Sequence, residues 1–109
     1  MPQTHKNLGQ SRPAAATNTT LYTAPAVTTT IVSSILVANI GADADLMRIF
    51  AVPSGGVTGV GNAIYYDVEL QNRDTALITA ALTLDTGDFV VVYSRDGDLT
   101  FTVSGLEIT

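Results

Sequence analysis

The stretch TTTIVSSILVANI, Thr28 to Ile40, decides the fold class of this chain. β-Branched residues dominate it, and no glycine, proline or charged residue interrupts it, which is typical of a buried β-strand. Strict alternation of side chains puts Ile31, Ile35 and Val37 on one face and Val32, Leu36, Ala38 and Ile40 on the other. A sheet in a small protein usually exposes one face to water, so the second apolar face of this strand needs a cover.

The rest of the chain alternates short strand-like runs with turn signals. Apolar residues make up 46% of the 109 residues and charged residues only 14%, which suits packed β-structure better than disorder or a helix bundle. The length allows one domain with one core. We therefore predict an all-β protein: a single small antiparallel β-sandwich or jelly-roll-like domain of about eight strands, with an extended N-terminal arm.

The run from Leu46 to Val52 also has two apolar faces. One face holds Met47, Ile49 and Ala51, and the other holds Leu46, Arg48, Phe50 and Val52. Apolar residues on a second face are expected to be covered by a neighbouring subunit. We predict that the subunit interface includes Val32, Leu36, Leu46, Phe50 and Val52.

Two later runs predict strands with a single apolar face. Between Ile64 and Leu70, the residues expected to face the core are Ile64, Tyr66, Val68 and Leu70, which leaves Tyr65, Asp67 and Glu69 in water. Asp96-Gly97 is the strongest short-range hairpin signal in the chain. After this turn, Leu99, Phe101 and Val103 are expected to alternate inward.

The first residues differ in composition from the rest. Met1 to Asn18 contains two prolines, one glycine, no aromatic residue and no hydrophobic period, so we predict an extended arm there and a β-sandwich domain over residues 19–109. The first 20 residues carry Lys6 and Arg12 without an acidic residue, and the remainder carries three arginines and ten acidic residues, giving +2 and −7. An acidic body disfavours nucleic-acid binding, and the basic arm is expected to lie on an acidic surface.

Residue content excludes several other classes of protein. The chain contains no cysteine, which excludes disulfides, thiolate metal sites and cysteine nucleophiles. Its N-terminus lacks the basic start, apolar middle and cleavage site of a signal peptide, and its longest apolar run is shorter than the roughly 20 residues of a membrane span. We expect a soluble protein made in the cytoplasm, with no membrane partner.

Asp85-Thr86-Gly87 matches the D-T-G signature of aspartic proteases. In a dimeric enzyme of retroviral type, two such aspartates would share a proton across a two-fold axis. Asp88 follows where that family has a small neutral residue, and its charge would disturb the pKa values of the pair. No second motif of the family follows. A plain β-turn is favoured, and we predict that the chain is not an enzyme.

The remaining polar residues also favour structural roles. Asp43, Asp45, Asp96 and Asp98 offer oxygen ligands for calcium, but they lack the spacing of the 12-residue calcium loop. His5, the only histidine, lies in the arm and cannot complete a Ser-His-Asp triad without folding onto the body. We therefore expect no metal and no cofactor.

Two features suit contacts with a partner better than chemistry. The loop from Pro53 to Asn62 contains four glycines, but no lysine or helix start follows it, so it predicts an exposed loop rather than a phosphate site. Such loops often carry contacts. Tyr65, together with Tyr93, would offer an aromatic platform for a sugar.

The order of segments resembles that of short structural proteins of tailed bacteriophages, over nearly the whole chain. The matching pieces are Leu8-Gly9-Gln10, Thr20-Leu21-Tyr22-Thr23-Ala24-Pro25-Ala26, Val32-Ser33-Ser34-Ile35-Leu36-Val37-Ala38-Asn39, Tyr65-Tyr66-Asp67-Val68 and Glu107-Ile108-Thr109. These pieces give the patterns LYTxPA, VSSIxVxN and YYDV, which together carry the resemblance.

This resemblance implies a virion component, commonly a capsid decoration or cement protein. Proteins of this kind form an oligomeric β-knob on a shell of major capsid protein, fastened by an extended terminal arm. The implied partners are the major capsid protein and further copies of this chain, as a homotrimer or otherwise a homodimer. The implied location is the outer surface of the capsid, after assembly in the host cytoplasm. In the arm, the expected contacts with the shell are Lys6, Leu8, Arg12 and Pro13.

The resemblance also extends to tail parts. The alternative prediction is therefore a tail or baseplate component that binds host surface glycans through its loops.

Overall fold

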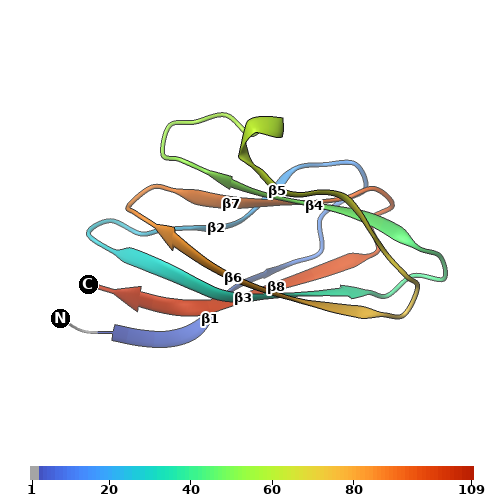
Figure 1. Ribbon diagram of the computed structural model, residues 1–109, viewed down its shortest axis with the longest axis horizontal. Helices are drawn as coiled ribbons and strands as arrows, with labels where there is room; N and C mark the ends of the chain where they lie inside the picture. The colour runs from blue at the N-terminus through green and yellow to red at the C-terminus, as the bar shows by residue number, and fades with distance from the viewer. Residues whose placement is uncertain (1–2) are drawn as a thin grey trace.

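The computed structural model describes residues 3–109, apart from the side chain of Ala80, as eight β-strands and one short 3-10 helix (Figure 1). The strands are β1 (Gln3–Ser11), β2 (Thr19–Thr23), β3 (Thr29–Asn39), β4 (Asp45–Val52), β5 (Ala63–Leu70), β6 (Thr75–Leu84), β7 (Phe89–Ser94) and β8 (Leu99–Ile108). The helix η1 (Val60–Asn62) lies in the connection between β4 and β5. No helix in the described part of the chain is long and apolar enough to cross a membrane.

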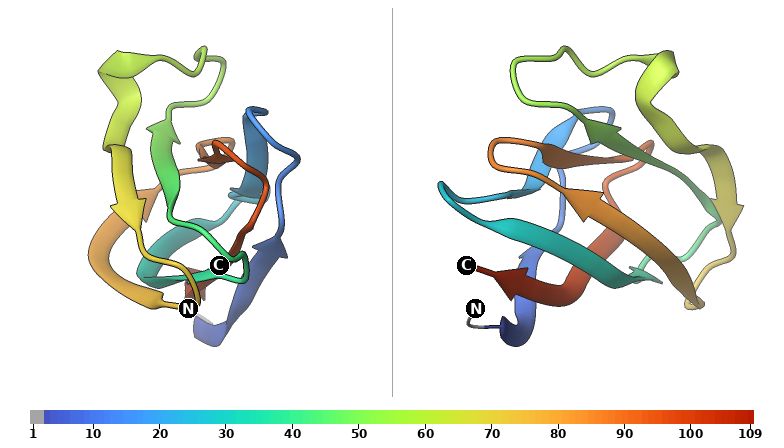
Figure 2. Two further views of the ribbon diagram at one scale, coloured as in Figure 1. Left: turned by 90° about the vertical axis from the view of Figure 1, so that its right-hand side faces the viewer. Right: turned by 60° about the vertical axis from the view of Figure 1, so that its left-hand side comes forward.

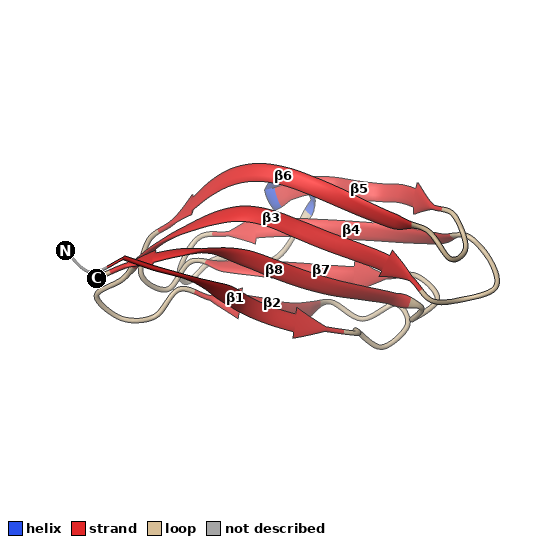
Figure 3. Cartoon of the chain, turned by 90° about the horizontal axis from the view of Figure 1, so that it is seen from below, coloured by secondary structure: helices blue, strands red, loops and turns tan. Residues whose placement is uncertain are grey.

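The strands form two four-stranded antiparallel sheets packed face to face (Figures 1 and 3). One sheet has the order β1-β8-β3-β6 and the other has the order β2-β7-β4-β5. Most strands that follow one another in the sequence therefore lie in opposite sheets. This order is that of the jelly roll, in which two Greek keys enclose one core. The predicted all-β sandwich or jelly roll of about eight strands is confirmed.

Strand β3 does not alternate strictly, because it carries an irregularity at Ser33. The register with both β6 and β8 shifts between Val32 and Ser34. An extra residue reverses the phase of alternation. Consequently Val32 before the shift, and Ile35 and Val37 after it, all face the core with at most 1% of their surface exposed. The prediction that Val32 lies on a second face is wrong.

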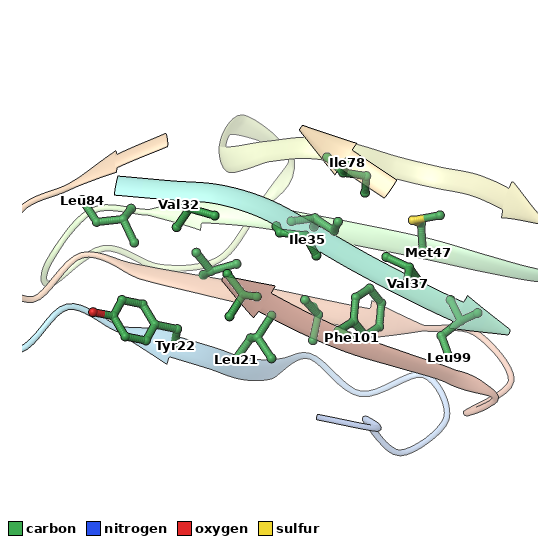
Figure 4. Packing of buried hydrophobic residues seen from close by; sticks show 14 of the residues in the cluster. Leu21, Tyr22, Val32, Ile35, Val37, Met47, Ile78, Leu84, Leu99 and Phe101 are labelled. Carbon is green, nitrogen blue, oxygen red and sulfur yellow. The ribbon is translucent and has the colours of Figure 1, made fainter. Parts of the chain in front are cut away.

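The main core fills the space between the two sheets (Figure 4). Every strand from β2 to β8 contributes at least one buried apolar residue to it. Leu99, Phe101 and Val103 of β8 are each 0% exposed, which confirms the predicted alternation after the Asp96-Gly97 turn.

A second apolar cluster lies on the other face of β4 and β7. It consists of Phe50, Val52 and Val91, with Ala63, Phe89 and Tyr93 packed against them. The β4–β5 connection passes close to this cluster, since a Cβ added to Gly56 would lie 3.2 Å from Val52 Cγ1. Figure 2 shows the connection projecting beyond the sheets. Phe50 and Val52 of the second apolar face of β4 are thus buried within the monomer, whereas Leu46 is half-buried.

Strand β5 also departs from the predicted alternation. Its register with β4 shifts between Met47 and Ile49. Within this bulge, Asp67 has a positive φ of 52°. Tyr65 packs against the main core, whereas Tyr66 is 44% exposed. The expected positions of these two tyrosines are therefore the reverse of those in the structure.

The segment expected to extend as an arm lies in a sheet over β1. This strand pairs with β8 from Gln3, opposite Ile108, to Ser11, opposite Phe101 (Figure 3). The chain then crosses to the other sheet, where Ala16 N donates to the carbonyl oxygen of Ser94 at 2.9 Å. Residues 3–11 are an edge strand of the sandwich and not a separate arm.

Candidate functional site

Lys6 joins β1 to the rest of the domain through a polar network. Its Nζ lies 2.7 Å from Glu107 Oε1 on β8. Glu107 Oε2 accepts a hydrogen bond of 2.6 Å from Tyr22 Oη, which lies 2.7 Å from the hydroxyl of Thr30. Burial and the hydrogen bond to Glu107 raise the pKa of Tyr22 to about 12. Hydrogen bonds from Lys6 and then Tyr22 hold the pKa of Glu107 below its usual value.

The other three residues expected to contact a shell also face this domain. Leu8 packs against the main core. Arg12 Nε donates to the carbonyl oxygen of Gly97 at 2.9 Å, in the turn between β7 and β8. Pro13 is buried. These contacts hold β1 and the crossing that follows it against the chain's own body.

Three of the five residues expected at a subunit interface are buried in the monomer. Val32 is 0% exposed in the main core, and Phe50 and Val52 are 3% and 1% exposed in the second cluster. Leu36 is 42% exposed and Leu46 is half-buried, so these two remain accessible to a partner. Alternation alone missed both the bulge in β3 and the close approach of the β4–β5 connection to Val52, since neither has a clear local signal.

The outer face of the sheet β1-β8-β3-β6 carries no lysine, arginine, aspartate or glutamate among residues 3–109. We call it the neutral face. Strands β1 and β8 contribute Gln3, His5, Asn7, Gln10, Thr100, Thr102, Ser104, Leu106 and Ile108. Strands β3 and β6 contribute Thr29, Ile31, Ser34, Leu36, Ala38, Thr75, Leu77, Thr79 and Thr83. None of the chain's ten acidic residues belongs to this face, although the net charge is −5.

Two cross-strand pairs of apolar side chains lie among the hydroxyl-bearing side chains of the neutral face. Leu36 and Leu77 lie directly opposite each other on β3 and β6, and they are 42% and 65% exposed. Ile31 and Leu106 form a second pair on β3 and β8. Depletion of charge is typical of the centre of protein interfaces. Sequence reasoning missed this surface because four strands far apart in the chain build it.

The outer face of the other sheet carries a cluster around Arg48. The bulge in β5 brings Asp67 to Arg48, whose Nε and Nη2 donate to Asp67 Oδ1 and Oδ2 at 2.6 and 3.3 Å. The guanidinium carbon lies 4.3 Å from the ring centroids of both Tyr66 and Tyr93, as in cation–π contacts. The aromatic pair on this face is therefore Tyr66 and Tyr93, and Tyr65 does not join it.

Asp45 is buried and holds the turn between β7 and β8. These two strands lie in opposite sheets and do not pair, so the hairpin predicted at Asp96-Gly97 is wrong, although these residues do connect two strands. Asp45 Oδ2 accepts a hydrogen bond of 2.6 Å from Ser94 Oγ, and its Oδ1 accepts one of 3.0 Å from the backbone N–H of Asp96. Burial alone would raise the pKa of Asp45, but these donors hold it below its usual value. Asp98 approaches Asp45 through its backbone N–H. Within the described residues, no three His, Asp or Glu side chains are grouped to hold a metal ion.

The Asp85-Thr86-Gly87 motif lies in the turn between β6 and β7, as predicted. Asp88 Oδ2 accepts a hydrogen bond of 3.0 Å from the backbone N–H of Asp85, and Gly87 has a positive φ of 87°. Asp85 borders an open cleft of about 470 Å³, lined also by Val27, Thr28, Thr29, Thr86, Ile108 and Thr109.

No protein-family model matches this chain, and no curated protein matches it. Among solved structures, a chain from infectious bursal disease virus of the Gx strain aligns with 97% of this chain, at a TM-score of 0.48 and 16% identity. A chain from the Gt strain aligns with 97%, at a TM-score of 0.45 and 14% identity. This chain spans 30% and 29% of their lengths. Because these identities and TM-scores are low, the function has to be inferred from the chain's own residues.

Proposed function

We propose that this chain is a virion structural protein, a decoration or cement protein that coats and stabilises a shell of major capsid protein. It would act on the outer surface of the shell, as a homotrimer or homodimer. The neutral face carries this proposal, because a broad uncharged sheet surface on an acidic chain suits burial against another protein. The jelly-roll order is consistent with it, since viral capsid domains use this fold. Lectin domains use it too, so the surface and not the fold is decisive.

The neutral face has the size that a stable contact needs. Four strands about 4.8 Å apart, over about eight residues of about 3.3 Å each, cover about 500 Å² in projection. Side-chain relief makes the accessible area larger, and a standard interface buries about 800 Å² on each partner. Several copies joined in one oligomer would bind the shell with increased effective concentration.

In this proposal the N-terminal segment does not act as the extended arm that the sequence predicted. Met1 to Asn18 would contact the shell mainly through β1, an edge strand of the neutral face, and not as an extended tail. Lys6 and Leu8 would act indirectly, because their contacts with Glu107 and the main core keep this strand in place.

Charges added to the neutral face test the proposal. The double variant Asn7→Asp, Gln10→Glu adds two negative charges on β1 with almost no change in side-chain size. We expect at least tenfold weaker binding in co-sedimentation with purified empty shells of the major capsid protein from the same particle, because the charges must be desolvated on contact.

Gln71→Glu, Asn72→Asp is the matched control. It makes the same two chemical changes in the exposed turn between β5 and β6, away from the neutral face. The control should coat shells as the unmodified chain does. Equal occupancy by the neutral-face variant and this control would refute the assigned surface.

A second candidate function, binding of host glycans by a tail or baseplate component, has its own supporting observation. Tyr66 is 44% exposed beside Arg48, Asp67 and Tyr93, so aromatic surface and polar groups lie together as sugars require. A glycan array probed with the whole chain tests it. This candidate predicts binding that Tyr66→Ala abolishes and Tyr65→Phe preserves. A chain that binds no glycan on the array would exclude it.

A further inference from the structure

Strand β6 is a long edge strand without the charges or proline that often protect a sheet edge. It runs for ten residues, TALITAALTL, and contains no charged residue, proline or glycine. No other strand in the described chain pairs with its outer edge (Figure 3). Its one protective feature is a bulge between Thr79 and Leu82, which leaves the half before Thr79 regular. Natural proteins blunt exposed edges with charges, prolines, bulges or short strands, because unpaired N–H and C=O groups invite another strand.

The other three edge strands carry such protection. Strand β1 contains Lys6 and a register shift at Leu8. Strand β2 is only five residues long and has a register shift. Strand β5 contains Asp67 and Glu69 and two register shifts. Strand β6 carries no charge, unlike β1 and β5, and is long, unlike β2, so its regular half is the edge most open to pairing.

Leu77 lies near the middle of the regular half of β6 and is 65% exposed. It is on the neutral face, directly opposite Leu36 of β3. An exposed leucine at the rim of an unprotected edge would be covered if a second strand paired beside it. Strand β6 itself contributes no charge to a contact between two copies, although each chain carries a net charge of −5.

We propose that β6 pairs antiparallel with β6 of a second copy across a two-fold axis at Leu77. In this register, Leu77 faces Leu77, Thr75 faces Thr79, and Ala76 faces Ile78. Residues that pair share a face, so the two cores and the two neutral faces both continue across the joint.

This pairing joins two four-stranded sheets into one of eight strands. On the neutral face, Leu36 and Leu77 of each copy form a row of four leucines across the axis. A two-fold contact uses the same surface on both copies, so the assembly is complete with two chains. The pairing therefore favours the homodimer over the homotrimer. The inference goes beyond the proposed function, since the pairing does not require a shell.

Single cysteines test the register, because the chain itself contains none. Directly opposite residues in an antiparallel pair have Cα atoms about 4.5–5.5 Å apart, within the range of a disulfide. Leu77→Cys should therefore convert most of the protein into a covalent dimer on mild oxidation. Thr79→Cys, on the same face of the same strand, would stand four residues from its own counterpart and should remain uncrosslinked.

Sedimentation of the whole chain at micromolar concentration gives a second, independent measurement. The unmodified chain should be a dimer, Leu77→Lys should weaken the dimer at least tenfold, and Val57→Lys should not. Val57 is the matched control because it is 86% exposed in the β4–β5 connection. A monomeric unmodified chain, or disulfide formation by Thr79→Cys equal to that by Leu77→Cys, would overturn the proposal.

Discussion

At the scale of single residues, a few polar side chains hold the ends of the sandwich together. Asp45 accepts hydrogen bonds that hold the turn between β7 and β8, and Glu107 links Lys6 to Tyr22. From the sequence, Asp45 was a candidate calcium ligand and Lys6 a candidate contact with a capsid shell. A residue type shows what a side chain can bind, but only the long-range strand pairing shows which partner lies beside it.

Acid is expected to destabilise the fold through these carboxyl groups. The pKa values of Asp45 and Glu107 are lowered in the folded state. Their contribution to stability is present above the unfolded-state value of about 4, and it is lost as the pH falls through the lower folded-state values. Urea unfolding between about pH 7 and pH 2 measures it. The double variant Asp45→Asn, Glu107→Gln should show a weaker pH dependence, and an unchanged dependence would contradict this assignment.

Gly105 is expected to tolerate no side chain. A Cβ there would collide with the backbone oxygen of Ile31 and lie 3.1 Å from Leu8 Cδ1. Gly105→Ala should lower the free energy of unfolding by about 1–3 kcal/mol, the usual cost of overpacking. Gly61→Ala is the matched control, because nothing lies within 4 Å of its added Cβ. Equal urea midpoints for the two variants would argue against this close approach of β3, β8 and β1.

At the scale of elements, strands without bulges matched their sequence pattern and strands with bulges did not. The alternation expected for β8 is confirmed by the buried Leu99, Phe101 and Val103. In β3 and β5, register shifts reversed the expected faces of Val32 and Tyr66. A period of two cannot locate a bulge, and one extra residue inverts every side chain beyond it. The strand character of β1 was missed for a related reason, since its partner β8 lies at the far end of the chain.

Removal of residues 1–18 should therefore weaken the domain and not merely remove a tail. The deletion takes away β1, the contact of Leu8 with the core and the Lys6–Glu107 ion pair, and it uncovers the edge of β8. We expect a lower thermal midpoint and faster aggregation than for the full chain, measured side by side by circular dichroism and light scattering. Identical melting of the two proteins would mean that β1 does not belong to the cooperative unit.

At the scale of the whole molecule, composition and the regular spacing of turns were enough to predict the fold class. The order of strands in the two sheets was not predictable, because the pairs β1–β8 and β3–β8 join distant parts of the chain. The neutral face depends on that order. Its residues look unremarkable one strand at a time, and they form an uncharged surface only when four strands are placed side by side. The jelly roll thus gives an acidic chain one side that another protein can cover.

A cryo-electron microscopy reconstruction of capsid shells saturated with the full chain tests the proposed function most directly. The account predicts added knobs of density on the outer surface, with the sheet β1-β8-β3-β6 against the shell and the β4–β5 connection pointing to solvent. Knobs that contact the shell through the β4–β5 connection, or shells that remain bare, would contradict it.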